Sequence, residues 1–152
     1  LATKAGIYGM VGGQVVDVQS EDSGDITREK LDFIYRLKTG ALLEASMMIG
    51  AVLAGAEEKQ LKKVEEMASA IGLAFQIQDD ILDVTSTEEQ LGKPVLSDEK
   101  NHKTTYVTLK GIDQARSDVA EISERAVSLL HEIPGSNPFL ENLIYMLINR
   151  EN

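Results

Sequence analysis

The stretch that decides the fold runs from Ile71 to Val84 and reads Ile-Gly-Leu-Ala-Phe-Gln-Ile-Gln-Asp-Asp-Ile-Leu-Asp-Val. Its apolar residues recur at helical spacing, and it contains one Gly and no Pro, so it is predicted to form a single helix. At about 100° per residue, the apolar side chains cover most of the circumference, which is typical of a buried helix. The polar positions form what we name the acidic seam: Gly72, Gln76, Asp79 and Asp83, with Asp80 beside them.

The acidic seam brings three carboxylates into or beside the protein interior. Asp79 and Asp83 are four residues apart, so their Cβ atoms lie roughly 5–6 Å from each other. At an effective dielectric constant of about 20, their repulsion costs roughly 3 kcal/mol. No Lys or Arg occurs between Val64 and Leu91 to offset it. A hard cation such as Mg²⁺ would convert repulsion into coordination, so the seam is predicted to be a metal–diphosphate site rather than a solvated acidic face.

Composition narrows the possible partners. The 152 residues carry a formal net charge of −10, which argues against nucleic acid or an anionic membrane surface as a partner. The absence of Cys excludes a disulfide scaffold and thiolate chemistry and is compatible with a cytoplasmic location. No signal peptide or membrane span is visible in the sequence. The chain lacks an initiator Met, and it is interpreted as part of a longer protein.

The first third of the chain is predicted to form two helices. One is expected over residues 3–19, where four glycines are interpreted as permitting close packing against another helix. The second is expected over residues 28–53, with Thr27 as its N-cap. Lys38-Thr39-Gly40 interrupts this second helix, and a glycine there invites a kink or a close approach of the backbone to a ligand. The four glycines are Gly6, Gly9, Gly12 and Gly13.

Helices are predicted through the rest of the chain as well. They are expected over residues 57–84, 113–130 and 139–149, and no strand pattern competes with them. The fold is therefore predicted to be all-α, with about six helices in one domain spanning residues 1–152. Between two of these helices, residues 93–103 form a long polar connection rich in basic side chains, which we expect to be mobile without a ligand.

The chemistry available to this chain is selective. It has two His, no Cys, no Gly-x-Ser-x-Gly and no phosphate-binding glycine loop after a strand. General acid–base and covalent catalysis are therefore poorly provided for. Carboxylates, a few Lys and an apolar helical interior suit a reaction in which a metal and Lys side chains stabilise a departing diphosphate. The apolar walls would then hold a hydrocarbon and exclude water.

Four motifs in this order resemble a known family. Asp79-Asp80-Ile-Leu-Asp83, preceded by Gly72-Leu-Ala-Phe-Gln76 and followed by Gly92-Lys93 and Lys103-Thr-Thr-Tyr106, is similar to the second aspartate-rich region of the trans-isoprenyl diphosphate synthases. Gly12-Gly-Gln14-Val-Val-Asp17 and Lys38-Thr39-Gly40 fall in the order expected for that family. The resemblance is strongest to bacterial farnesyl diphosphate synthases (geranyltranstransferases). It implies the C-terminal helices of an isoprenoid-synthase-type bundle.

The resemblance also implies roles for individual residues. Asp79 and Asp83 would bind Mg²⁺, with Asp80 and Asp98 acting through waters. Lys38, Lys93 and Lys103 would hold the diphosphate of the allylic substrate. Thr39 and Gln76 would border the reacting carbon chain, Phe75 would line the pocket, and Gln14 and Asp17 would lie close by. Arg150 would help to close over the second substrate, isopentenyl diphosphate.

The same resemblance implies a homodimer and a reaction that joins the two diphosphates head to tail. The first aspartate-rich motif of the family does not occur in this sequence, so the chain by itself is expected to be inactive. Three alternatives stay open: a non-catalytic regulatory subunit, a terpene cyclase, and a plain helical bundle with an acidic groove. The second Asp-Asp-x-x-Asp together with Lys38-Thr39 favours the synthase over the cyclase.

Overall fold

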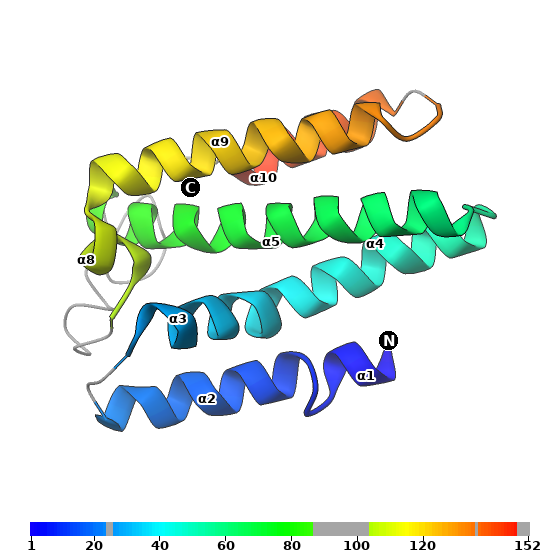
Figure 1. Ribbon diagram of the computed structural model, residues 1–152. Coiled ribbons are helices and arrows are strands. Elements are labelled where there is room, and N and C mark those ends of the chain that lie inside the picture. The colour runs from blue at the N-terminus through cyan, green and yellow to red at the C-terminus, as the bar shows by residue number, and fades with distance from the viewer. Residues whose placement is uncertain (24–25, 87–103, 136, 149–152) are drawn as a thin grey trace.

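Helices make up all the regular structure in the computed structural model, which describes residues 1–23, 26–86, 104–135 and 137–148. No strand occurs among those residues, so the predicted all-α fold is confirmed. Figure 1 shows the helices lying side by side in a bundle. In chain order they are α1 (Ala2–Ala5), α2 (Met10–Ser23), α3 (Arg28–Tyr35), the π-helical segment η1 (Arg36–Gly40), α4 (Ala41–Leu53), α5 (Glu58–Thr85), α8 (Tyr106–Lys110), α9 (Ile112–His131) and α10 (Pro138–Ile148).

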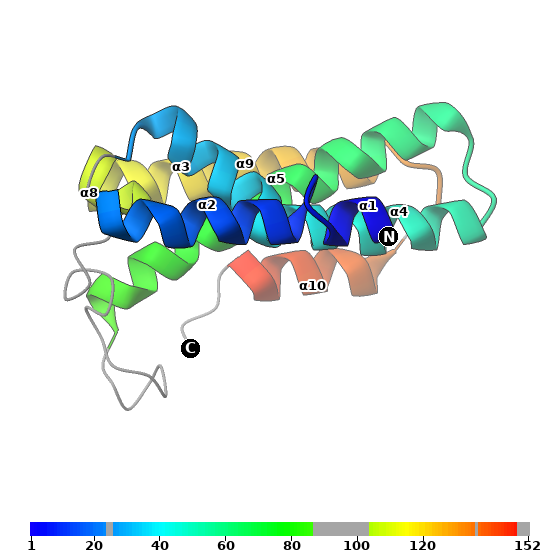
Figure 2. The same ribbon diagram turned by 90° about the horizontal axis from the view of Figure 1, so that it is seen from below.

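The long helix α5 is the centre of the bundle. It packs against α9 on one side and against η1 and α4 on the other, with α2 lying beyond η1 (Figure 1). Figure 2 shows α3 and α10 on opposite sides of the bundle. The large apolar side chains that are most deeply buried come from α3, α5 and α10; they are Leu31, Ile34, Met67, Ile71, Ile77, Ile144 and Ile148.

Two helix starts follow directly from the sequence. Thr27 caps α3, since its side-chain oxygen accepts from the backbone N–H of Lys30 at 3.3 Å, as predicted. Glu57 caps α5 in a reciprocal arrangement in which its own backbone N–H donates to Gln60 Oε1 at 2.7 Å. The predicted helix over residues 57–84 is therefore confirmed almost to the residue.

The first predicted helix is divided in two. We expected one segment over residues 3–19, but α1 ends at Ala5 and α2 begins at Met10. The chain turns so tightly between them that a Cβ on Gly9 would overlap the carbonyl group of Lys4. Gly9 and Gly12 meet their own chain, whereas Gly13 alone meets another element, η1. The expected close packing between helices thus holds for one of the four glycines.

The predicted interruption of the second helix is present as a change of helix type. Residues Arg36–Gly40 form a π-helical turn, and α3 and α4 continue on either side of it. Such turns occur mostly as single insertions inside α-helices and often at functional sites. Lys38 and Thr39 are both carried by this turn.

Candidate active site

The acidic seam lies at the interior of the bundle. Asp83 is 2% exposed and Asp80 is 8% exposed, while Asp79 is half-buried. A solvated acidic face would expose all three carboxylates, so that alternative is wrong for this helix. Gln76 and Phe75, one turn earlier on α5, are also half-buried.

A close contact between two glycines turns the seam towards η1. A Cβ added to Gly72 would lie 2.9 Å from the Cα of Gly40, so α5 and η1 approach there at backbone distance. Sequence reasoning associated Gly40 with a close approach to a ligand, and the structure shows an approach to another helix. Because Gly72 belongs to the acidic seam, the seam begins where α5 meets the Lys38-Thr39-Gly40 turn.

A second motif joins the first through an ion pair. Lys38 Nζ donates to Asp17 Oδ2 at 2.6 Å, and the side chains are 31% and 3% exposed, respectively. The helices fit closely here, since a Cβ on Gly13 would overlap the backbone nitrogen of Lys38. Gln14, on the next residue of α2, is half-buried. The Gly-Gly-Gln-x-x-Asp and Lys-Thr-Gly motifs therefore form one unit, which sequence spacing alone could not show.

Asp80 makes contacts that sequence reasoning missed. Its Oδ2 accepts a short hydrogen bond from the hydroxyl of Tyr35 and another, at 2.7 Å, from the backbone N–H of Tyr106. Tyr35 is the last residue of α3, and Tyr106 is the first residue of α8. The sequence held a partial signal, because Tyr35 lies on the buried stripe of its helix and Tyr106 ends the Lys103-Thr-Thr-Tyr motif. We name these three residues the Asp80 tie.

Tyr106 is fixed in turn by α9. Its hydroxyl donates to Asp118 Oδ2 at 2.6 Å, and Lys110 Nζ lies 2.6 Å from the same oxygen and 2.7 Å from the hydroxyl. Hydrogen bonds from Lys110 and then from Tyr106 lower the pKa of Asp118 to about 2. The bond to Asp118 raises the pKa of Lys110, and burial raises that of Tyr106.

Four predicted site residues lie outside the described residues. They are Lys93, Asp98, Lys103 and Arg150. The described part of the predicted site therefore consists of Gln14 and Asp17 on α2, Lys38 and Thr39 on η1, and Phe75, Gln76, Asp79, Asp80 and Asp83 on α5.

A metal would find part of its ligand set here. Within the described ranges, no three His, Cys, Asp or Glu side chains converge on one point. Asp79 and Asp83 nevertheless lie one turn apart on one side of α5 and offer the carboxylate oxygens that Mg²⁺ prefers. Asp80 fits this set less well, because its Oδ2 already accepts two hydrogen bonds. Asp79 and Asp83 thus fit a magnesium site that takes its other ligands from water or from phosphate oxygens.

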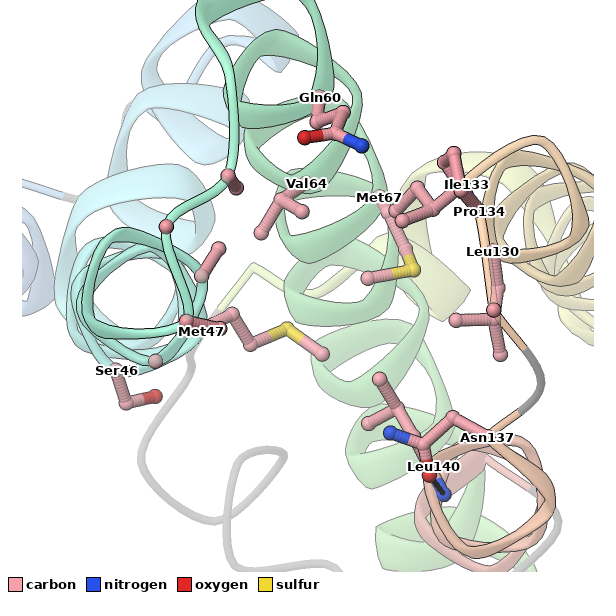
Figure 3. Close-up of a pocket in the computed structure, with 16 residues that line it drawn as sticks. Ser46, Met47, Gln60, Val64, Met67, Leu130, Ile133, Pro134, Asn137 and Leu140 are labelled. Carbon is pink, nitrogen blue, oxygen red and sulfur yellow. Dashed lines mark hydrogen bonds between the residues drawn. The ribbon is translucent and has the colours of Figure 1, made fainter.

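A pocket of about 620 Å³ opens elsewhere (Figure 3). It lies between the last turns of α4, the first turns of α5, the end of α9 and the start of α10. Its walls include Met47, Val64, Met67 and Leu140, and none of the described residues that line it is charged. Met67 and Asp79 are twelve residues apart, or about 18 Å along the helix axis. The pocket therefore lacks the cations that a diphosphate needs and is separate from the acidic seam.

Comparison with known proteins now decides the family. The sequence pattern of the polyprenyl synthetase family matches residues 3–132. The chain belongs to the polyprenyl synthetase family. As a member of it, this polyprenyl synthetase chain carries its Gly-Gly-Gln-x-x-Asp, Lys-Thr-Gly and Asp-Asp-x-x-Asp motifs on three helical elements in contact.

Relatives of this polyprenyl synthetase chain make different products. It is 42% identical to a geranylgeranyl diphosphate synthase of Cyanophora paradoxa, over 95% of this chain and 48% of the relative. It is 44% identical to the farnesyl diphosphate synthase of Geobacillus stearothermophilus, over 79% of this chain and 40% of the relative. The chain thus spans less than half the length of these curated relatives.

A solved structure shows the same arrangement of helices. The geranyltransferase of Helicobacter pylori, crystallised with magnesium and an isoprenyl diphosphate, superposes with a TM-score of 0.80 at 31% identity. The match covers 98% of this chain and 48% of that one. Among the described helices, none is both long and apolar enough to cross a membrane.

Proposed function

We propose that this chain is the C-terminal part of a short-chain prenyl diphosphate synthase, which joins an allylic diphosphate to isopentenyl diphosphate head to tail. The observation that carries the proposal is the meeting of three motifs. Asp17 pairs with Lys38, and two residues later Gly40 contacts Gly72 at the start of the acidic seam. Anion-binding and metal-binding side chains thereby belong to one face of the bundle.

In this proposal Asp79 and Asp83 hold Mg²⁺, and Asp98 supports them through water. The bound ion would neutralise the negative charge of the diphosphate. Lys38 donates hydrogen bonds to the diphosphate oxygens as the carbon–oxygen bond breaks, and for this its ammonium group must turn away from Asp17. Lys93 and Lys103 would add two more donors.

The apolar part of the site would protect the reacting carbon chain. Thr39 and Gln76 would border the allylic carbons, with Phe75 on the pocket wall and Gln14 nearby. The buried flanks of α5, including Ile77 and Ile81, would keep water from the carbocation character that develops as the diphosphate leaves. Arg150 would close over isopentenyl diphosphate.

A farnesyl-type product is our first choice for the chain length, and the geranylgeranyl-type relatives supply the second. A terpene cyclase and a non-catalytic regulatory subunit remain as alternatives. We also propose that the complete protein is a cytoplasmic homodimer.

The decisive experiment uses the full-length protein with Mg²⁺, isopentenyl diphosphate and an allylic diphosphate. We expect turnover, and we expect Asp79→Ala to lower it by at least about a hundredfold. Asp113→Ala, an exposed carboxylate on α9, serves as the matched control and should leave turnover within twofold. Full activity of the Asp79→Ala variant would contradict the proposal, and an inactive wild-type protein would favour the regulatory subunit.

A second experiment addresses the plain helical bundle. Calorimetry on this chain with a bisphosphonate, with and without Mg²⁺, should detect heat only when both are present. Binding that ignores Mg²⁺, or no binding at all, would favour a structural role for the acidic seam.

A further inference from the structure

Three buried polar groups from three helices meet at the Asp80 tie. We propose that Asp80 is a positioning residue, which ties α5 to the end of α3 and to α8 and so orients the acidic seam, rather than a residue that binds the metal. The inference rests on the proposed function for its effect on catalysis, whereas the tie itself can be tested without any turnover.

The contacts at Asp80 are of a kind that fixes a side chain. Tyr35, Asp80 and Tyr106 are 5%, 8% and 6% exposed, so the carboxylate is withdrawn from bulk water. Both donors reach the same oxygen, Oδ2, and the N–H of Tyr106 also donates a longer hydrogen bond, at 3.3 Å, to the hydroxyl oxygen of Tyr35. A carboxylate in such surroundings is stabilised by these hydrogen bonds, and the loss of either one costs free energy because the charge is withdrawn from water. A metal on Oδ2 would have to compete with both donors.

The backbone N–H of Tyr106 needs a hydrogen-bond acceptor from outside its own helix. Tyr106 is the first residue of α8, so its N–H has no acceptor within the helix. The hydroxyl of the same residue is held to α9 by Asp118, and Lys110, at the other end of α8, donates to that hydroxyl as well. The contact with α9 therefore fixes the position of the backbone N–H that donates to Asp80 on α5.

Because of the position of Asp80, the Asp80 tie also affects where Asp79 and Asp83 point. Asp80 follows Asp79 and precedes Asp83 by three residues on the same helix. A carboxylate stands about 6 Å from the axis of an α-helix, so rotation of α5 by about 10° would move Asp79 by about 1 Å. A displacement of that size can cost a reaction about a hundredfold in rate.

The other end of the tie reaches the diphosphate side of the site. Tyr35 directly precedes η1, and Lys38 follows three residues later. A single hydrogen bond between Tyr35 and Asp80 thus joins the turn that carries Lys38 to the helix that carries Asp79 and Asp83. The tie sets the distance between the anion-binding and the metal-binding side chains.

The first test measures amide hydrogen exchange of Tyr106 in the metal-free, full-length protein. We expect Asp80→Ala to speed exchange of that amide at least tenfold, because the change removes the acceptor at 2.7 Å and leaves only the longer bond, at 3.3 Å, to the hydroxyl of Tyr35. Asp79→Ala is the matched control and should leave the exchange rate within twofold. Unchanged exchange in Asp80→Ala would overturn the proposal.

The second test separates positioning from metal binding by titrating turnover with Mg²⁺. Asp79→Asn and Asp83→Asn should raise the half-activating Mg²⁺ concentration more than tenfold, and Asp80→Asn by less than about threefold. We also expect Asp80→Asn to lower turnover at saturating Mg²⁺, and Tyr35→Phe, which removes only the hydroxyl, should lower it to a similar extent. The double variant should be no worse than the worse single one, because both remove the same contact.

Tyr145→Phe on α10, an exposed tyrosine, controls for the loss of a hydroxyl and should be silent. A tenfold rise of the Mg²⁺ requirement in Asp80→Asn, with a silent Tyr35→Phe, would make Asp80 a metal ligand and overturn the proposal. An inactive wild-type protein would overturn the proposed function, and hydrogen exchange would still decide whether Asp80 holds Tyr106.

Discussion

Asp17 and Lys38 differ in burial, and this difference governs what their ion pair contributes. Asp17 is buried and Lys38 is partly exposed, so Lys38 can turn towards solvent or a ligand while Asp17 cannot. Sequence motifs identified both as site residues, but not as partners. They are 21 positions apart, and only the packing of α2 on η1 brings them together.

A double-mutant cycle on Asp17→Asn and Lys38→Met measures this pair. We expect each single change to destabilise the full-length protein, with a coupling energy of about 1–3 kcal/mol from urea denaturation. The exposed pair Glu58 and Lys62 on α5 is the matched control, and its coupling should be about 0.3–0.5 kcal/mol. Additivity of Asp17→Asn and Lys38→Met would contradict the prediction.

The lowered pKa of Asp118 makes the free energy of unfolding depend on pH. Its pKa falls from 3.8 to about 2 on folding, so the unfolded chain binds more protons and the stabilisation is complete above about pH 4. As the pH falls from 4 towards 2, the stabilisation is lost. The shift corresponds to about 2 kcal/mol.

The measurement compares wild-type protein with Asp118→Asn by urea denaturation. The difference in the free energy of unfolding should be about 2 kcal/mol at pH 6 and should shrink below pH 4. Glu121→Gln, an exposed carboxylate on the same helix, should change stability by less than about 0.5 kcal/mol. A difference for Asp118→Asn that stays constant from pH 6 to pH 3 would rule out this origin.

At the scale of elements, apolar periodicity predicted the helices well and their interruptions less well. Helix α5 was predicted within a residue or so at each end because its pattern is long and its start is capped. The break between α1 and α2 was missed, because the sequence does not distinguish a glycine needed for a turn from a glycine needed for close contact between helices. Only the position of neighbouring backbone, as at Gly9 and Gly13, distinguishes the two.

Gly72 and Gly50 give opposite predictions for the same substitution. Gly72→Ala places a methyl group 2.9 Å from the Cα of Gly40, so α5 and η1 must separate, and we expect a loss of about 1–2 kcal/mol. Gly50→Ala on α4 meets nothing within 4 Å and should gain about 0.5–1 kcal/mol from better helix propensity. Thermal denaturation of both variants checks the pair. Equal effects would mean that the contact at Gly40 does not constrain the helices.

At the scale of the whole molecule, the sequence predicted that the acidic seam lies in the interior, but it did not predict which contacts hold its side chains. The acidic seam was found from periodicity and charge, and its burial is confirmed. The Asp80 tie was missed because tyrosine hydroxyls and backbone N–H groups leave no spacing pattern. Such contacts depend on three helices that meet from positions 35, 80 and 106.

The outer face of the N-terminal helices is the surface at which we expect the proposed dimer to form. Val11, Val15 and Val18 are 41%, 48% and 50% exposed, and their spacing of four and three residues makes one apolar stripe along α2. Tyr8, which is 77% exposed, lies in the turn just before this helix. A stripe with this spacing is the narrow seam by which one helix packs against another. A second copy of the same chain can supply an identical stripe across a two-fold axis.

Val15→Glu tests the second copy as the partner of this stripe. Two glutamates would face each other near the axis of a symmetric dimer, so we expect sedimentation to show the full-length variant as a monomer at concentrations where the wild-type protein is a dimer. Met146→Glu on α10 is the matched control, because Met146 is 63% exposed and the change adds the same charge. This variant should leave the dimer intact. If the wild-type protein is a monomer, the stripe is instead covered by another segment of the same protein. A dimer that survives Val15→Glu would place the interface on a different face, because a symmetric contact cannot bury that paired charge without a large loss of affinity.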